Sequence, residues 1–72
     1  MKHLVVDIQG IDTSSSADNM ARALRLLQGV HKAHIDFNAH EAVIEYDENR
    51  IHPQEFVTLI QQSGYKAHLA KD

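Results

Sequence analysis

The amino-acid sequence predicts an α+β domain with its elements in the order βαββαβ, the ferredoxin-like arrangement. Three observations carry this prediction. Segments 2–8, 33–37 and 42–46 alternate between apolar and polar residues, as strands do. Apolar residues with helical spacing follow segment 2–8 and segment 42–46. Glycines stand at the expected ends of these elements. Connection rules then favour an antiparallel sheet of strand order 4-1-3-2 with both helices on one face. A chain of 72 residues has room for a single domain, residues 1–72.

The first strand and the first helix are predicted from a change in hydrophobic spacing. Residues 2–8 place leucine, valine and isoleucine at alternate positions, which is typical of a half-buried strand. From Ala17 onwards, apolar residues fall at three- and four-residue intervals, and Gly29 stands at the expected position just beyond a helix. Ser14, Ser15 and Ser16 are the candidate N-cap residues, and Ser15 with Asp18 has the spacing of a capping box.

A hairpin, a second helix and a short strand make up the remainder of the predicted fold. The two later alternating segments flank a short turn at 38–40, which indicates two antiparallel strands. Pro53 suits the first position of a helix, because the amide that it lacks has no partner there. Gly64 is expected to end this helix. Residues 65–70 are predicted to form the fourth strand, with Ala67 and Leu69 facing inward.

One hydrophobic core is expected between the sheet and the helices, formed by the apolar residues of the inward faces. Its expected members are Leu4, Val6, Ile8, Met20, Leu24, Leu27, Ile35, Phe37, Ile44, Phe56 and Ile60. The opposite face of the sheet is expected to be polar and to carry three of the six histidines, His3, His34 and His68.

Composition and charge exclude several classes of protein. The chain contains no cysteine, so disulfides, zinc–thiolate sites and thiol catalysis are excluded. A net charge of −3 and an open face without aromatic residues argue against nucleic-acid binding. No apolar run approaches the roughly 18 residues of a membrane span, and no signal peptide is apparent, so we expect a cytoplasmic protein without membrane insertion. No histidine is placed to orient a nucleophile, so we expect no enzymatic activity.

Four short segments of the chain together indicate a family. They are Gly10-Ile11-Asp12, Leu26-Leu27-Gln28-Gly29-Val30, Val43-Ile44-Glu45-Tyr46-Asp47 and Ser63-Gly64-Tyr65. Because the four segments occur in this order and register, the chain resembles a heavy-metal-associated (HMA) domain. This family includes bacterial copper chaperones and the N-terminal metal-binding modules of metal-transporting P-type ATPases. The resemblance covers essentially the whole chain and implies the same ferredoxin-like fold.

The resemblance also implies where a metal site would lie. In the family, a G-x-x-C-x-x-C loop between the first strand and the first helix supplies two thiolates for monovalent copper. Here the two cysteine positions hold Thr13 and Ser16. A hydroxyl is neutral, hard and a poor ligand for soft metal ions, so we expect no thiolate-type site at these positions. Tyr65 matches the aromatic residue beside the metal loop of bacterial chaperones, with packing at a strand start as its alternative role.

Histidines are the remaining candidate ligands. Met1-Lys2-His3 has the X-X-His form, in which the terminal amine, two amide nitrogens and the imidazole give the square-planar set that favours divalent copper or nickel. His3 and His68 fall on adjacent predicted strands and are a second candidate pair. His34 and His68 lie on opposite edges, about 14 Å apart, and are too distant to share an ion. For each histidine, a solvated surface side chain is the alternative.

The sequence therefore predicts a small, chaperone-like HMA module in copper or other heavy-metal handling and transport that lacks the thiolate site. It would bind divalent metal weakly through nitrogen ligands, or regulate a metal-transporting P-type ATPase or another metal-handling protein by contact. The alternative is a metal-free protein–protein interaction or structural module. Partners of such sheets bind the open face or pair with an edge strand.

Overall fold

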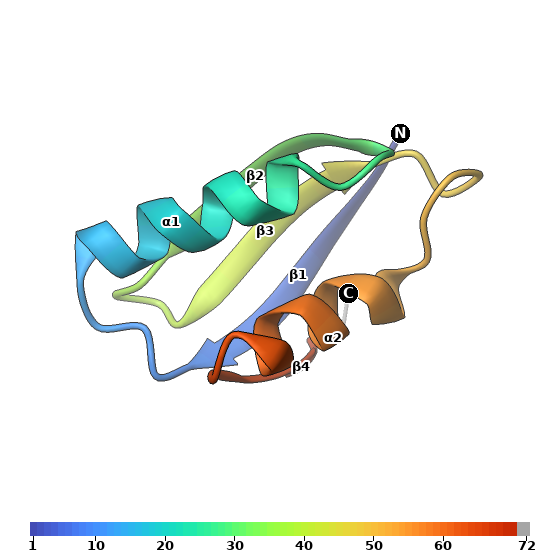
Figure 1. Cartoon of the computed structure of the whole chain (residues 1–72). Helices are drawn as coiled ribbons and strands as arrows, with labels where there is room; N and C mark the ends of the chain where they lie inside the picture. The colour runs from blue at the N-terminus through green and yellow to red at the C-terminus, as the bar shows by residue number, and fades with distance from the viewer. Residues whose placement is uncertain (71–72) are drawn as a thin grey trace.

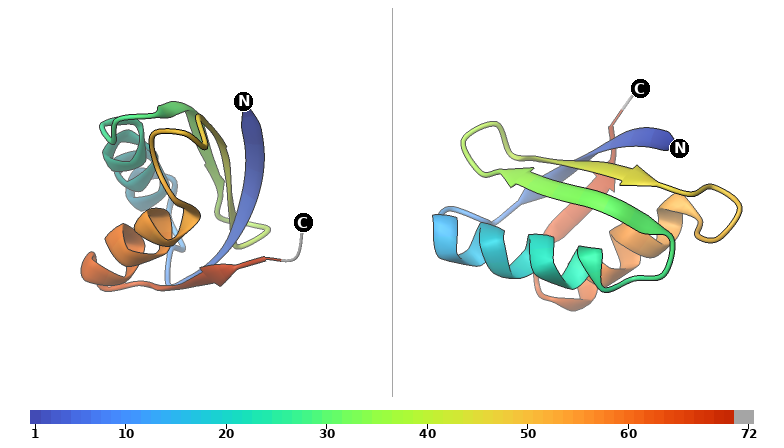
Figure 2. Two further views of the ribbon diagram at one scale, coloured as in Figure 1. Left: turned by 90° about the vertical axis from the view of Figure 1, so that its right-hand side faces the viewer. Right: turned by 90° about the horizontal axis from the view of Figure 1, so that it is seen from above.

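A computed structural model describes residues 1–70 of the chain. The elements are β1 (Lys2–Gln9), α1 (Ser14–Arg25), β2 (Val30–Asp36), β3 (Glu41–Tyr46), α2 (Pro53–Gln62) and β4 (Lys66–Leu69). The strands form one antiparallel sheet in the order β2-β3-β1-β4, and both helices lie against the same face (Figures 1 and 2). The predicted fold and strand order are therefore confirmed. Within the described part of the chain, neither helix combines the length and apolar character needed to cross a lipid bilayer.

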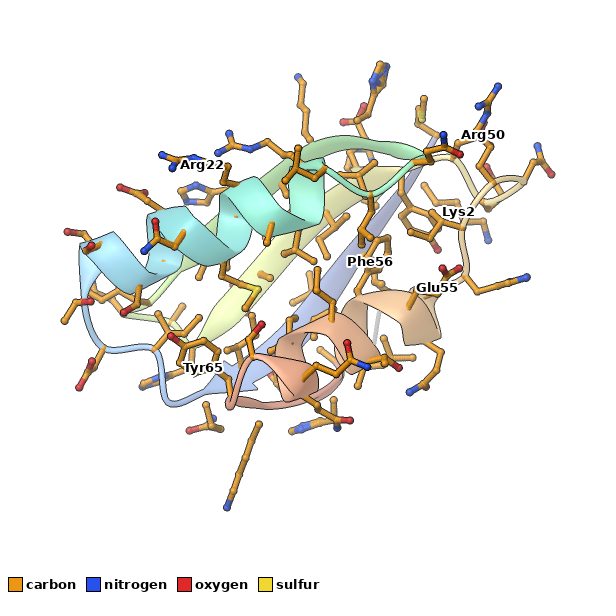
Figure 3. All side chains as sticks on the ribbon, viewed as in Figure 1. Lys2, Arg22, Arg50, Glu55, Phe56 and Tyr65 are labelled. Atoms are coloured by element: carbon orange, nitrogen blue, oxygen red, sulfur yellow. The ribbon has the colours of Figure 1, made fainter. Side chains whose placement is uncertain are left out.

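The hydrophobic core fills the space between the sheet and the two helices. Most of the expected core residues are buried: Val6, Ile8, Met20, Leu24, Ile35, Ile44, Phe56 and Ile60. Leu4, Leu27 and Phe37 are partly buried and pack against this set. Phe56 points from α2 towards the sheet (Figure 3) and meets Tyr46 of β3 edge to face, with ring centroids 5.3 Å apart.

Loops and the last strand contribute to burial in ways that alternation does not reveal. Ile11 and Ile51 are 2% and 4% exposed, although both lie outside the strands and helices. Leu69 lies opposite the buried Val6, on the inward face as expected, but it is 43% exposed and so does not belong to the buried core. It is the last residue of a short edge strand, where only β1 lies alongside, and Ala67 is the buried residue of that strand.

Helix α2 begins and ends at the predicted residues. Pro53 occupies its first turn, and Gly64 follows it with a φ of +96°, a conformation that glycine adopts without steric cost. The Gly64 amide donates to the carbonyl of Gln61 at 3.1 Å. The Tyr65 amide donates to the carbonyl of Ile60 at 3.3 Å, which completes a Schellman motif and directs the chain into β4.

Helix α1 differs from the expectation at both ends. Its N-cap is Thr13 rather than one of the three serines that follow it, because the Thr13 hydroxyl accepts the hydrogen bond from the Ser16 amide. The helix ends at Arg25, so Gly29 lies several residues beyond it, in the turn that leads into β2. The helix therefore begins at Ser14, directly after the loop that follows β1.

Candidate functional site

The loop between β1 and α1 contains Thr13 and Ser16, the two predicted cysteine-equivalent positions. The Thr13 hydroxyl donates to Ser16 Oγ at 3.0 Å, and Thr13 Oγ1 accepts from the Ser16 amide at 3.1 Å. Thr13 is exposed and Ser16 is half-buried. The structure therefore brings the two positions together, and their hydroxyl groups bond to each other at the start of the helix.

The base of this loop is formed by a glycine and an aromatic ring. Gly10 follows β1 with a φ of +107°, and a Cβ atom on it would lie 3.1 Å from Cδ1 of Tyr65. The ring consequently lies directly against Gly10, at the loop end of the molecule (Figure 3). Tyr65 and Ser16 also line a hollow of about 170 Å³ between α1 and the end of α2. Tyr65 thus stands beside the loop and supports its backbone.

The start of α1 would suit an anion, yet the side chains of Thr13 and Ser16 are neutral. The first turn of α1 contains no acidic residue. Its unpaired amides and the helix dipole create a positive potential, in which a cysteine would be stabilised as a thiolate. The hydroxyls of Thr13 and Ser16 carry no charge and are hard oxygen donors. This arrangement can cap the helix, but it offers no soft ligand to a metal ion.

The structure places His3 and His68 in separate environments on the open face of the sheet. The Nε2 atom of His3 lies 3.1 Å from Glu45 Oε2, and that of His68 lies 3.0 Å from Asp7 Oδ2. In the sheet register, His3 is opposite Glu45, whereas His68 is opposite Asp7. His3 and Asp7 are four positions apart on β1, roughly 13 Å along the strand. The two histidines are therefore not brought together.

The amino-terminal segment is seen in its strand-paired form. Met1 is 63% exposed, while Lys2 and His3 belong to β1 and lie opposite Tyr46 and Glu45. A square-planar complex would need the Lys2 and His3 amide nitrogens, so this end of β1 would have to leave the sheet. Terminal residues are held by few contacts, which keeps the cost of such fraying low.

Another group of histidines lies around a hollow of about 450 Å³ beside β2. Its lining includes His3, His31 and His34, together with Glu45 and Arg25. The sequence did not reveal this grouping, because a register irregularity between Val30 and Lys32 interrupts the alternation of β2. No group of three or more histidine, aspartate or glutamate side chains within residues 1–70 is arranged to hold a metal ion.

The sequence of this chain is similar to that of a known domain family and of individual proteins. Residues 5–66 match the model of the heavy-metal-associated domain. A copper chaperone CopZ from Staphylococcus haemolyticus is 28% identical over 65 residues, covering 90% of this chain and 96% of that protein. An uncharacterized protein from Haemophilus influenzae is 30% identical over 67 residues, covering 93% of this chain and 97% of that protein.

Solved structures show the same fold. A copper binding domain from HMA7, a P-type ATPase, has a TM-score of 0.93 at 21% identity, covering 99% of this chain and 96% of that chain. The yeast copper transporter domain Ccc2a has a TM-score of 0.92 at 22% identity, covering 100% of this chain and 99% of that chain. At these identities the likeness establishes the fold, and the chemistry must be argued from this chain's own residues.

Proposed function

The chain belongs to the heavy-metal-associated domain family, and we propose that it acts in heavy-metal handling by contacting a partner protein, without carrying monovalent copper in its β1–α1 loop. The observation that supports this proposal is the hydroxyl pair of Thr13 and Ser16, bonded at 3.0 Å within a loop that keeps its glycine and its aromatic support. Monovalent copper prefers soft ligands, and these two oxygens are hard and neutral.

The proposed partner is a metal-transporting P-type ATPase or another metal-handling protein. Support comes from relatives named as a copper chaperone and as a copper binding domain of a P-type ATPase. We place the contact at the surface formed by Gly10, Asp12 and Thr13, which is exposed and keeps the relatives' loop position. A module with this surface and no thiolates would occupy a docking site without delivering an ion, and so regulate its partner. A cytoplasmic location forms part of this proposal.

The loop chemistry is tested by competition with a strong chelator of monovalent copper. We expect the chelator to remove the ion completely from the native chain under reducing conditions, because no thiolate holds it. A CopZ chaperone with both cysteines serves as the positive control in the same titration. Retention of one copper ion per native chain against the chelator would overturn the proposal.

The contact role is tested by adding an N-terminal ATPase domain to isotope-labelled chain and recording amide NMR shifts. We expect changes at Gly10, Thr13 and Tyr65, and none at Glu48 and Asn49, which lie in the turn after β3. Shifts confined to the open face of the sheet would instead favour a metal-free interaction module with a different docking surface. An absence of any shift would reject the ATPase domain as partner.

A second proposal concerns divalent metal at the chain end. The His3 side chain is 70% exposed, so leaving Glu45 costs its side chain only a surface contact, in addition to the strand pairing of Lys2 and His3. In a chain with a free amine at Met1, divalent copper or nickel would be bound weakly by the amine, two amides and the imidazole. Binding releases amide protons, so affinity should rise steeply with pH.

The amino-terminal site is tested by the visible absorption band of the square-planar copper complex. Both His3→Ala and the addition of one residue before Met1 should abolish the band, while His68→Ala should leave it intact. If His68→Ala removes the band and the extension does not, the ion is bound on the sheet face and the amino-terminal proposal is wrong.

A further inference from the structure

The two edges of the sheet differ in length and in surroundings. β2 has seven residues and β4 has four, and each has a single neighbouring strand. In the right-hand view of Figure 2, β2 (green) forms the long outer edge. The hollow of about 450 Å³ reaches from this edge over the neighbouring strands, and its lining residues are Arg25, His31, Lys32, Ala33 and His34 together with His3, Val43 and Glu45. An edge strand with free backbone groups beside open space is a template for another strand.

The exposed residues of β2 form an ordered row of charges. Lys32, His34 and Asp36 alternate on the open face, and all three are exposed. A lysine on an edge strand ordinarily discourages pairing with other chains. In an antiparallel pair of two β2 strands with a two-fold axis at His34, however, Lys32 of each copy lies opposite Asp36 of the other. Each lysine then faces one aspartate, and the two-fold symmetry gives two such pairs.

Other symmetric registers of the same two strands are less favourable. An axis at Ala33 would place Lys32 opposite His34 of the second copy, without a matching acid. An axis at Ile35 would reduce the overlap within β2 to residues 34–36. The axis at His34 pairs residues 32–36 and sets Ala33 against Ile35 on the inner side. The axis at Ala33 gives the longer overlap, over residues 30–36, so the matching of Lys32 with Asp36 is what favours the register at His34.

We propose that two copies of this chain pair through β2 about a two-fold axis at His34, and that the two His34 imidazoles form a site for a divalent transition-metal ion. Directly opposed residues of an antiparallel pair have Cβ atoms about 4.5–5.5 Å apart. At that separation, two imidazole nitrogens can reach one zinc ion at about 2.0–2.1 Å, with water completing the coordination. His3 and His68 each contact a carboxylate, whereas His34 has no such contact within the described residues.

The metal and the strand pairing depend on each other. Pairing over residues 32–36 buries less surface than the roughly 1,200–2,000 Å² of a standard stable interface, so the metal-free dimer is weak. An ion that binds only the paired form shifts the equilibrium towards it by mass action. The site is formed from β2 alone and does not involve the β1–α1 loop. Its failure would therefore leave the proposed contact function untouched.

Sedimentation of the full chain with and without zinc tests this proposal. Zinc is the suitable probe, because the square-planar set at the amino terminus favours copper and nickel. We expect zinc to convert the monomer into a dimer with one ion per two chains, and EDTA to reverse the change. His34→Ala should abolish the zinc response, whereas His31→Ala, on the same strand, should leave it unchanged.

A charge series tests the register. Lys32→Asp places an acid opposite Asp36 of the second copy and should abolish the dimer, while circular dichroism should show a retained fold. Adding Asp36→Asn should restore dimerisation in part, because it removes the repulsion. The new amide oxygen can still accept from the amides of Asn38 and Ala39, as Asp36 Oδ1 does now at 3.0 and 3.1 Å.

Three results would overturn the proposal. A zinc dimer that persists in both His34→Ala and Lys32→Asp would place the interface elsewhere. A chain that stays monomeric at millimolar protein with excess zinc would exclude the interface altogether. A dimer that Lys32→Asp abolishes, but that responds neither to zinc nor to His34→Ala, would keep the strand pairing and exclude the metal site.

Discussion

The two helices of this domain begin in different ways. At the start of α2, the carboxylate of Glu55 accepts from the His52 amide at 3.0 Å, so a negative charge faces the positive end of the helix dipole (Figure 3). At the start of α1, the hydroxyl of Thr13 caps the Ser16 amide, and no acidic residue stands in the first turn. One helix start is compensated by a charge, and the other only by a neutral group.

This difference shows what the chain has kept of its family's site and what it has replaced. An uncompensated helix start suits a thiolate, because a thiolate supplies the negative charge. The α1 loop of this chain keeps Gly10 and the supporting ring of Tyr65, but it holds hydroxyls that bond to each other. The start of α1 therefore offers hydroxyl oxygens, which are poor ligands for a soft metal ion.

Restoring the thiolates should give the largest effect. In Thr13→Cys with Ser16→Cys, two soft ligands would return to the α1 start, and affinity for monovalent copper should rise by orders of magnitude. One ion per chain should then resist a strong chelator in the competition assay. The single variants should gain far less, because each supplies one thiolate. If the double variant fails to retain copper, the loop geometry differs from that of the family.

Inside the core, the two helices should behave alike despite their different starts. Leu24 of α1 and Phe56 of α2 are both 0% exposed. Leu24→Ala should lower the free energy of unfolding by about 2–5 kcal/mol, and Phe56→Ala by about 3–5 kcal/mol, measured by urea denaturation. The control is Leu26→Ala at the end of α1, where the side chain is 81% exposed and the change should be below about 0.5 kcal/mol. A Leu24→Ala variant as stable as this control would mean that the inward face of α1 is misassigned.

The two caps should respond differently to salt. Thr13→Ala removes a neutral cap and should lower the free energy of unfolding by about 0.5–2 kcal/mol at any salt concentration, while Thr13→Ser should be nearly neutral. Glu55→Gln keeps an acceptor but removes the charge, so it should cost about 0.3–1 kcal/mol at low salt and less at high salt. Equal salt dependence in the two variants would contradict the comparison of the helix starts.

A carboxylate at the start of α1 should give the smallest effect. Ser16 stands at the position in α1 that Glu55 holds in α2, the third residue of each helix. Ser16→Glu should therefore raise the free energy of unfolding by about 0.3–1 kcal/mol at low salt, with Ser16→Gln as the uncharged control. Destabilisation by both variants would instead show that the packing of Ser16 beside Tyr65 outweighs the dipole.

Much of the fold could be predicted because its signals are local. Alternation and helical spacing depend only on neighbouring residues, and they identified every strand and helix. Pro53 and Gly64 marked the start and end of α2 because their backbone restrictions apply wherever they occur. Thr13 and Ser16, by contrast, were singled out only through the resemblance to the family and its loop motif.

The N-cap of α1 could not be predicted in the same way. Thr13 and the three serines after it are all residue types that cap helices, so local preference does not distinguish among them. The choice of Thr13 depends on where the chain leaves β1, which happens at Gly10, beside the ring of Tyr65. Ile11 and Ile51 are buried for a comparable reason, since the closing of the loops over the core leaves no periodic trace.

The sequence alone determined which face of the sheet each side chain occupies, and the tertiary structure decided which side chains meet. Moving a strand by two positions keeps every residue on its face and changes all of its neighbours. The pairing of β1 with β3 and β4 therefore placed His3 beside Glu45 and His68 beside Asp7. Register arises from contacts between distant segments, and hydrophobic alternation within one strand carries no information about it.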